Sequence, residues 1–138
     1  MRQKILFVDD DRRRTEIFVE MLRMEGYDVT FAATIKEAES EFKEGASDYD
    51  LIIHDIMMPY EDYIGENKQE SRTSGIRFLE HIRKIKSKEE LPVIVLTVHY
   101  DEATKKQTYK AGCNEYVEKP CLPSKLLKKV KENLKIQV

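Results

Sequence analysis

Five short apolar runs alternate along the chain with amphipathic stretches, and this order constrains the fold more than any other feature. The runs predict strands, whereas the stretches between them repeat their apolar residues at helical spacing. The predicted strands cover 5–8, 27–31, 51–53, 92–96 and 115–117. Strands that alternate with helices form a parallel sheet with right-handed crossovers and helices on both faces. The sequence therefore predicts an α/β domain with five parallel strands and five helices.

Capping and stop residues place the ends of the predicted helices. Thr34 to Glu37 has the form of a capping box, and Gly26, Gly45 and Gly112 are placed to end helices. The five helices are predicted at about 12–25, 34–45, 75–87, 101–111 and from Pro123 onward. The residues predicted to face the core are Ile17, Phe18, Met21 and Leu22 in the first helix and Phe78, Leu79, Ile82 and Ile85 in the third.

Composition indicates one ordinary globular domain. The chain has 138 residues, of which 41% are hydrophobic and 36% charged, so we expect a single domain over 1–138. A formal net charge of −2 gives no support for binding nucleic acid or a membrane surface. Cys113 and Cys121 fit no metal or redox motif and are expected to be reduced thiols in a cytoplasmic protein.

The segment from Tyr60 to Ser74 interrupts this regular order. It is polar, mixed in charge and without a sustained period, which predicts an inserted surface loop at about 60–74. Such an insertion costs little entropy, so it is either simply tolerated or used for contacts with a partner.

Polar residues that suit phosphoryl chemistry follow four of the predicted strands. Asp9 and Asp10 end the first strand, Asp55 follows the third, Thr97 the fourth and Lys119 the fifth. Ligands of open α/β sheets bind beyond the carboxyl ends of the strands, so these groups are expected to converge. Crowded carboxylates repel, and a bound Mg²⁺ would offset that repulsion. Taken singly, the same residues could be helix caps, strand residues or solvated charges.

Four segments carry a resemblance to a known family. ILFVDD, LIIHDIMMP, PVIVLT and EYVEKP resemble the receiver domains of two-component response regulators, in particular the single-domain chemotaxis regulators. The spacing also agrees, because Gly75 to Thr97 and Thr97 to Lys119 are each 22 positions. This resemblance implies a flavodoxin-like fold with strand order 2-1-3-4-5.

The resemblance also implies a role for each candidate residue. Asp55 would be the phosphoacceptor, and Lys119 would contact the phosphoryl group. The peptide bond between Lys119 and Pro120 would be cis, which turns the lysine into the site. The implied ligands of Mg²⁺ are Asp9, Asp10, Asp55 and the backbone carbonyl of Met57, and the implied switch residues are Thr97 and Tyr116. Such a protein is not an enzyme beyond its own phosphorylation and dephosphorylation. Its implied partners are a sensor histidine kinase or phosphotransfer protein, a downstream effector and a second copy bound through the fourth helix, fifth strand and fifth helix.

Three departures from the family pattern concern the surroundings of the acceptor. Pro59 and Gly75 are 16 positions apart, Val98 replaces a small residue, and Cys121 stands where a larger apolar residue is common. The stiff Val98 is predicted to narrow the approach to Asp55, or else to pack under the fourth helix.

Two other functions stay open at this point. One is a receiver-like module that signals through its surface without phosphorylation. The other is a Mg²⁺-dependent phosphatase that uses an aspartyl phosphate, although the run from Asp9 to Arg13 lacks the hydroxyl residue such enzymes use.

Overall fold

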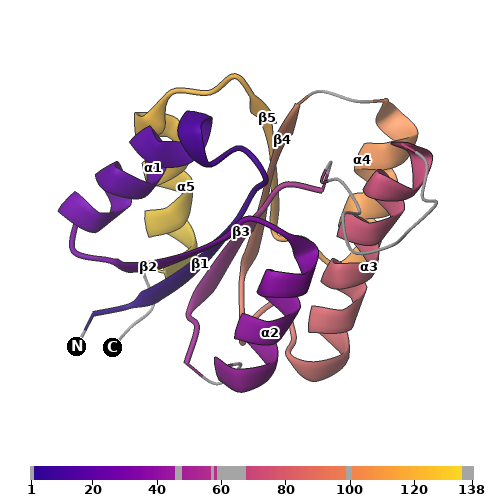
Figure 1. Ribbon diagram of the computed structural model, residues 1–138, viewed down its shortest axis with the longest axis horizontal. Coiled ribbons are helices and arrows are strands. Elements are labelled where there is room, and N and C mark those ends of the chain that lie inside the picture. The colour runs from indigo at the N-terminus through magenta and orange to yellow at the C-terminus, as the bar shows by residue number, and fades with distance from the viewer. Residues whose placement is uncertain (1, 46–47, 57, 59–67, 99–100, 135–138) are drawn as a thin grey trace.

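The computed structural model describes residues 2–45, 48–56, 58, 68–98 and 101–134. Within these ranges five parallel strands form one sheet in the order β2-β1-β3-β4-β5, as predicted. The strands are β1 (Lys4–Val8), β2 (Asp28–Ala32), β3 (Leu51–His54), β4 (Val93–Val98) and β5 (Glu115–Lys119). The helices are α1 (Arg12–Met24), α2 (Ile35–Gly45), α3 (Lys68–Ile85), α4 (Glu102–Ala111) and α5 (Pro123–Leu134). Helices α1 and α5 cover one face of the sheet, and α2, α3 and α4 cover the other (Figure 1).

The central strand β3 is buried along its whole length. Because neighbouring side chains of a strand point to opposite faces, Ile52 packs in the core under α2 and α3 while Leu51 and Ile53 pack in the core under α1 and α5. Full burial of each such side chain stabilises the fold by about 1.5–3 kcal/mol. A hydrophobic core on each face packs the sheet against the helices. The position of the carboxyl edge of the sheet is therefore fixed relative to those helices.

The predicted core faces of α1 and α3 need two corrections. Ile17 and Ile85 were predicted to be buried, but they are 60% and 51% exposed. In α1 the buried side chains are Thr15, Val19 and Leu22, a spacing that turns position 17 toward solvent. Ile85 is the last residue of α3, where the helix leaves the sheet.

Helix α3 begins seven residues earlier than predicted, at Lys68 instead of Gly75. The predicted loop over 60–74 is therefore wrong for 68–74, and residues 60–67 lie outside the described residues. Gly75 lies inside the helix because the helix packs closely on the end of β3 there. A Cβ at this position would lie 2.4 Å from the backbone oxygen of Ile56, so a larger residue would push α3 away.

Among the described residues, no helix combines the length and the apolar character needed to cross a membrane.

Candidate functional site

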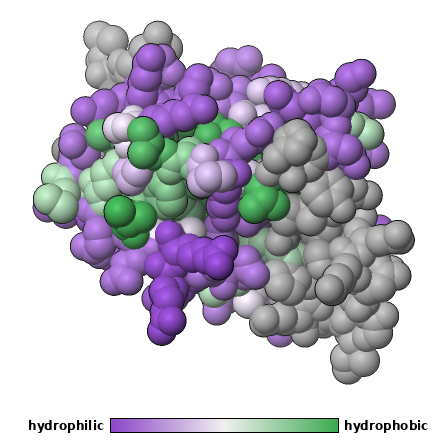
Figure 2. Space-filling view, turned by 90° about the horizontal axis from the view of Figure 1, so that it is seen from above, coloured by the Kyte–Doolittle hydropathy of each residue, from purple (hydrophilic) through white to green (hydrophobic). Residues whose placement is uncertain are grey.

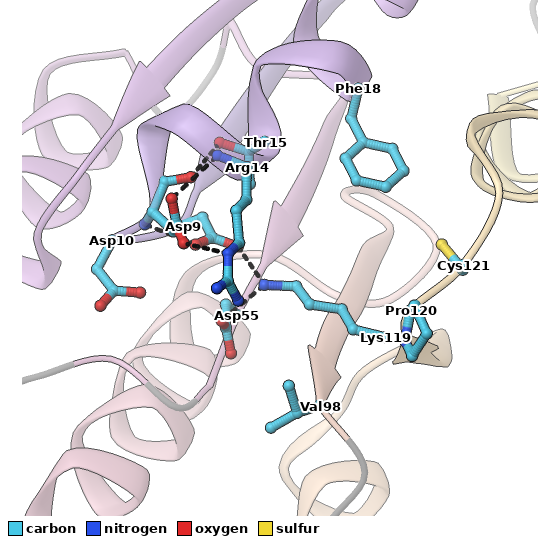
Figure 3. Close-up of a pocket in the computed structure, with 11 residues that line it drawn as sticks. Asp9, Asp10, Arg14, Thr15, Phe18, Asp55, Val98, Lys119, Pro120 and Cys121 are labelled. Carbon is cyan, nitrogen blue, oxygen red and sulfur yellow. Dashed lines mark hydrogen bonds and ion pairs between the residues drawn. The ribbon is translucent and has the colours of Figure 1, made fainter.

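The sheet itself places the two buried carboxylates of the site. Asp9 directly follows β1, and its backbone N–H donates to the carbonyl of Ala32 at 3.1 Å. Asp55 directly follows β3, and its N–H donates to the carbonyl of Val8 at 2.9 Å. Both bonds continue the sheet beyond its assigned strands, so the two side chains leave neighbouring strands at the same level (Figure 3).

Lys119 and Thr97 both donate to Asp55. Lys119 is the last residue of β5, and its Nζ donates to Oδ2 of Asp9 at 2.7 Å and to Oδ2 of Asp55 at 3.1 Å. The buried Thr97 hydroxyl, near the end of β4, donates to Oδ1 of Asp55 at 2.8 Å. The Lys119–Pro120 peptide bond is cis, as the resemblance implied. The structure thus brings together four residues that lie far apart in the sequence.

Three carboxylates crowd around this single ammonium group. Carboxylate oxygens of Asp9, Asp10 and Asp55 all lie within 4.8 Å of one another. Burial raises the pKa of Asp9 to about 6, and repulsion from Asp55 adds to the effect, although Lys119 opposes it. Burial and Asp55 likewise raise the pKa of the more exposed Asp10. The pKa of Lys119 is lowered by burial but raised more strongly by Asp55 and Asp9, so the ammonium stays charged.

This set of ligands fits a hard divalent cation. Mg²⁺ prefers oxygen ligands and is bound in proteins by one or two carboxylates together with water and phosphate oxygens. Asp9, Asp10 and Asp55 offer such oxygens at one spot, where excess negative charge would be offset by the ion. The fourth predicted ligand, the backbone carbonyl of Met57, lies outside the described residues.

A cavity of about 450 Å³ opens over these groups. Its lining residues are Asp9, Asp10, Asp11, Arg14, Thr15, Phe18, Asp55, Val98, Lys119, Pro120 and Cys121. One side is charged and the other, formed by Phe18, Val98 and Pro120, is apolar (Figure 3). Viewed from above Figure 1, apolar surface lies over the half that contains α1 and α5 (Figure 2). The cavity is larger than a phosphoryl group needs, so it also has room for the group that carries it.

Sequence reasoning missed four lining residues, Asp11, Arg14, Thr15 and Phe18. Asp11 is the N-cap of α1 and the other three belong to the helix, where spacings of three and four residues place side chains on one face. That spacing was a usable signal. Val98 is 49% exposed and lines the cavity, so its effect on the approach to Asp55 stays a prediction.

Tyr116 lies on β5, on the same face of the sheet as Thr97. Residue Val95 of β4 pairs with Tyr116, and Thr97 lies two positions further along the same strand. The Tyr116 ring centroid is 6.3 Å from that of Tyr109 on α4, and Nζ of Lys105 is 5.7 Å from it. Its hydroxyl is buried without a hydrogen-bond partner in the described part of the chain, and burial raises its pKa to about 12. The ring therefore lies between the strand that carries Thr97 and helix α4.

His54 precedes Asp55 but does not belong to the site. Its Nε2 lies 3.0 Å from the carbonyl oxygen of Gly75, and its ring packs edge-on against Phe78. Because neighbouring residues of a strand point to opposite faces of the sheet, His54 faces away from Asp55. Burial lowers the pKa of this fully buried imidazole and so favours its neutral form.

Comparison with known proteins gives one consistent family. The family described as "Response regulator receiver domain" has a sequence model that matches residues 5–131. The transcriptional regulatory protein ResD of Bacillus subtilis (strain 168) is 34% identical over 132 residues, which are 96% of this chain and 48% of ResD. The chain thus spans about half the length of this relative.

Two solved structures have the same architecture over nearly their whole length. A CheY-like receiver domain protein from Methanospirillum hungatei JF-1 is 27% identical with a TM-score of 0.79, covering 98% of this chain and 95% of its own. A receiver domain protein from Clostridium thermocellum is also 27% identical with a TM-score of 0.79, covering 96% and 94%.

Proposed function

Because the chain belongs to the response regulator receiver domain family, we propose that it is a phosphoacceptor of a two-component system and that Asp55 accepts the phosphoryl group. The observation that carries this proposal is the setting of Asp55. Thr97 donates to one of its oxygens and Lys119 to the other, at the base of an open cavity. An aspartate that only ended a strand would need neither contact.

In the proposed reaction, Asp55 attacks phosphorus in line with the leaving group. A bond forms between a carboxylate oxygen of Asp55 and phosphorus, the bond from phosphorus to the donor nitrogen or oxygen breaks, and its electron pair leaves with the donor. Lys119 already lies 3.1 Å from Asp55 and would follow the transferred oxygens. Mg²⁺, when bound by Asp9, Asp10 and Asp55, would supply the further positive charge that phosphoryl transfer needs.

We propose that Thr97 and Tyr116 then transmit the change. A phosphoryl group on Asp55 would draw the Thr97 hydroxyl away from its present bond to the carboxylate. The space left beside Thr97 would admit the ring of Tyr116, which shares that face of the sheet. Movement of this ring away from Tyr109 and Lys105 would alter the surface formed by α4, β5 and α5. An effector, or a second copy of the chain, would recognise that surface.

The proposed donor is a phosphohistidine of a sensor kinase or phosphotransfer protein in the cytoplasm. The imidazole of such a donor would enter the side of the cavity formed by Phe18, Val98 and Pro120. An interaction module that needs no phosphorylation would not require the contacts of Lys119 with both Asp9 and Asp55. The phosphatase alternative is less supported, because Arg13 stands where such enzymes have their hydroxyl residue.

Intact-mass spectrometry after incubation with acetyl phosphate and Mg²⁺ tests the proposal. We expect one added phosphoryl group on the wild type and none on Asp55→Asn. Asp28→Asn is a matched control, because Asp28 is an exposed aspartate at the start of the edge strand β2. Equal labelling of wild type and Asp55→Asn would refute the assignment, and an unlabelled wild type would favour the interaction module.

A further inference from the structure

Three consecutive arginines begin α1, and they have different surroundings. The guanidinium of Arg12 lies over the ring of Phe31, 4.8 Å from its centroid. Arg13 is exposed, and Arg14 lines the cavity over Asp55. Of these three arginines, only Arg14 therefore lines the cavity where a phosphodonor would bind (Figure 3).

Asp11 contacts both the backbone and the side chain of Arg14. The carboxylate of Asp11 caps α1 by accepting from the backbone N–H of Arg14 at 3.0 Å. Its other oxygen lies 3.3 Å from Nε of the same arginine. The Asp11 carboxylate thus contacts both the backbone N–H and Nε of Arg14. The Arg14 side chain is 89% exposed, which places it at the mouth of the cavity, while Lys119 lies at the base.

The two cations of the cavity would meet different parts of a donor. Lys119 is engaged by Asp9 and Asp55, next to the attacking oxygen. In an in-line transfer the leaving group lies opposite the attacking oxygen, so it points toward the mouth. Arg14 is the arginine on that side. A guanidinium pairs well with a carboxylate because its parallel N–H groups match the two oxygens.

We propose that Arg14 is a specificity-determining residue that favours donors whose leaving group is a carboxylate, namely acyl phosphates. This inference rests on the proposed phosphorylation of Asp55. The Asp55–phosphorus bond forms, the bond between phosphorus and the acyl oxygen breaks, and the electron pair stays on that oxygen as a carboxylate beside Arg14. With phosphoramidate, whose nitrogen is protonated as –NH₃⁺, the phosphorus–nitrogen bond breaks and its electron pair stays on the nitrogen. Neutral ammonia therefore leaves, and no negative charge develops near the guanidinium.

The test compares labelling rates of the full chain with acetyl phosphate and with phosphoramidate, both in excess Mg²⁺. We expect Arg14→Gln to slow labelling by acetyl phosphate about three- to five-fold, the scale of one exposed charge pair. Labelling by phosphoramidate should stay near the wild-type rate. Arg13→Gln is the matched control, since it removes the same charge one residue away, and it should change neither rate.

The outcomes separate this inference from the proposed function. A wild type that neither donor labels would contradict the proposed function itself. An equal loss with both donors, an equal loss in Arg13→Gln, or no loss in Arg14→Gln would overturn the role of Arg14 while leaving Asp55 as the acceptor. Labelling at raised salt provides a second measurement. With acetyl phosphate, the labelling rates of Arg14→Gln and wild type should become more similar as salt is added, because exposed charges are screened.

Discussion

Two polar clusters lie at opposite edges of the sheet, and they are built in opposite ways. At the carboxyl ends of the strands, Asp9, Asp10 and Asp55 lie close together, and one lysine pairs with Asp9 and Asp55. At the amino ends, the guanidinium of Arg83 in α3 donates hydrogen bonds to uncharged oxygens. We call this second cluster the Arg83 clamp; its acceptors are the carbonyls of Lys86, Ser87, Leu91 and Gly112 and the side-chain oxygen of Asn114.

In the Arg83 clamp, the hydrogen bonds join three segments that meet at the amino ends of the strands. Arg83 Nε donates to the carbonyl of Gly112 at 2.7 Å, after the end of α4, and Nη1 donates to that of Leu91 at 2.8 Å, before β4. Nη2 donates to Oδ1 of Asn114 at 3.0 Å, and the same oxygen accepts from the N–H of Val93 at 2.9 Å. One side chain therefore ties α3 to the segments before β4 and β5.

The difference shows which cluster stabilises the fold and which serves chemistry. In the Arg83 clamp each nitrogen of the guanidinium donates to an oxygen, although burial lowers the pKa of Arg83. Negative charge is in excess at the carboxyl ends, where the pKa of Asp9 is raised to about 6. A raised carboxyl pKa means that the ionised form is disfavoured by folding. The sheet thus has a stabilising cluster at its amino edge and a destabilising one at its carboxyl edge.

The largest expected effect comes from removing the clamp. Arg83→Ala should lower the free energy of unfolding by about 2–4 kcal/mol, because it leaves several partly buried carbonyls without a donor. Urea unfolding measures this loss, and Arg77→Ala, at an exposed position of the same helix, is the control. Labelling of Asp55 should persist under native conditions. An unchanged unfolding midpoint would show that water replaces the guanidinium at no cost.

A smaller change in the free energy of unfolding, of opposite sign, is expected from a substitution at the carboxyl ends of the strands. Asp10→Asn removes one of three repelling charges and leaves both ion pairs of Lys119 intact. Without Mg²⁺ the variant should be more stable by roughly 0.5 kcal/mol, a modest value because Asp10 is exposed. Added Mg²⁺ should stabilise the wild type more than the variant.

Glu39→Gln is a suitable control for this experiment, because Glu39 is an exposed acid on α2, on the far side of the sheet from α1. It should leave both measurements near wild type. If Asp10→Asn were less stable than wild type in the absence of Mg²⁺, the carboxylates would not be in repulsion, and the contrast with the Arg83 clamp would be lost.

The sequence predicts the site far better than it predicts the clamp. Asp9, Asp55, Thr97 and Lys119 lie within two residues of the carboxyl ends of predicted strands, so the parallel sheet alone brings them together. Arg83 occupies a position that helical periodicity leaves partly exposed, and its partners are mostly backbone oxygens. Every residue has a backbone carbonyl, so the sequence does not show which carbonyls an arginine will contact. No sequence motif therefore predicts such a cluster.

The errors in helix placement have a similar cause. The sequence predicts the start of α3 at Gly75 because the apolar residues at helical spacing begin just after it, at Phe78. The real role of Gly75 is the close approach to Ile56, which depends on where the helix packs and not on local preference. Ile17 is predicted to be buried because it lies at helical spacing from Met21, whereas the small, hydrogen-bonded Thr15 takes a buried position on α1. Tertiary packing decided both cases.

Val98→Ala should affect chemistry at the carboxyl ends with almost no effect on stability. Val98 is 49% exposed, so its truncation should change the free energy of unfolding by less than about 0.5 kcal/mol. It should widen the approach to Asp55 and speed labelling by acetyl phosphate. Leu122→Ala is the control, since Leu122 is 71% exposed and does not line the cavity. Unchanged labelling would show that Val98 does not limit access.

The smallest effect concerns the two thiols, one at each end of β5. Cys113 is fully buried beside Gly112 and Asn114, and burial raises its pKa to about 12. Cys121 is only half-buried and lines the cavity, although burial raises its pKa as well. Since the thiolate is the reactive form, both should react slowly with Ellman's reagent, Cys113 far more slowly than Cys121.

In the native wild type we therefore expect one thiol to react and the second to appear only on unfolding. Arg83→Ala should expose Cys113 to the reagent through local opening at the amino ends, while Asp10→Asn should leave it protected. Cys121→Ser identifies which thiol gives the first phase. If Cys113 reacted as fast in the wild type as in Arg83→Ala, the clamp would not be what keeps the amino ends of β4 and β5 closed.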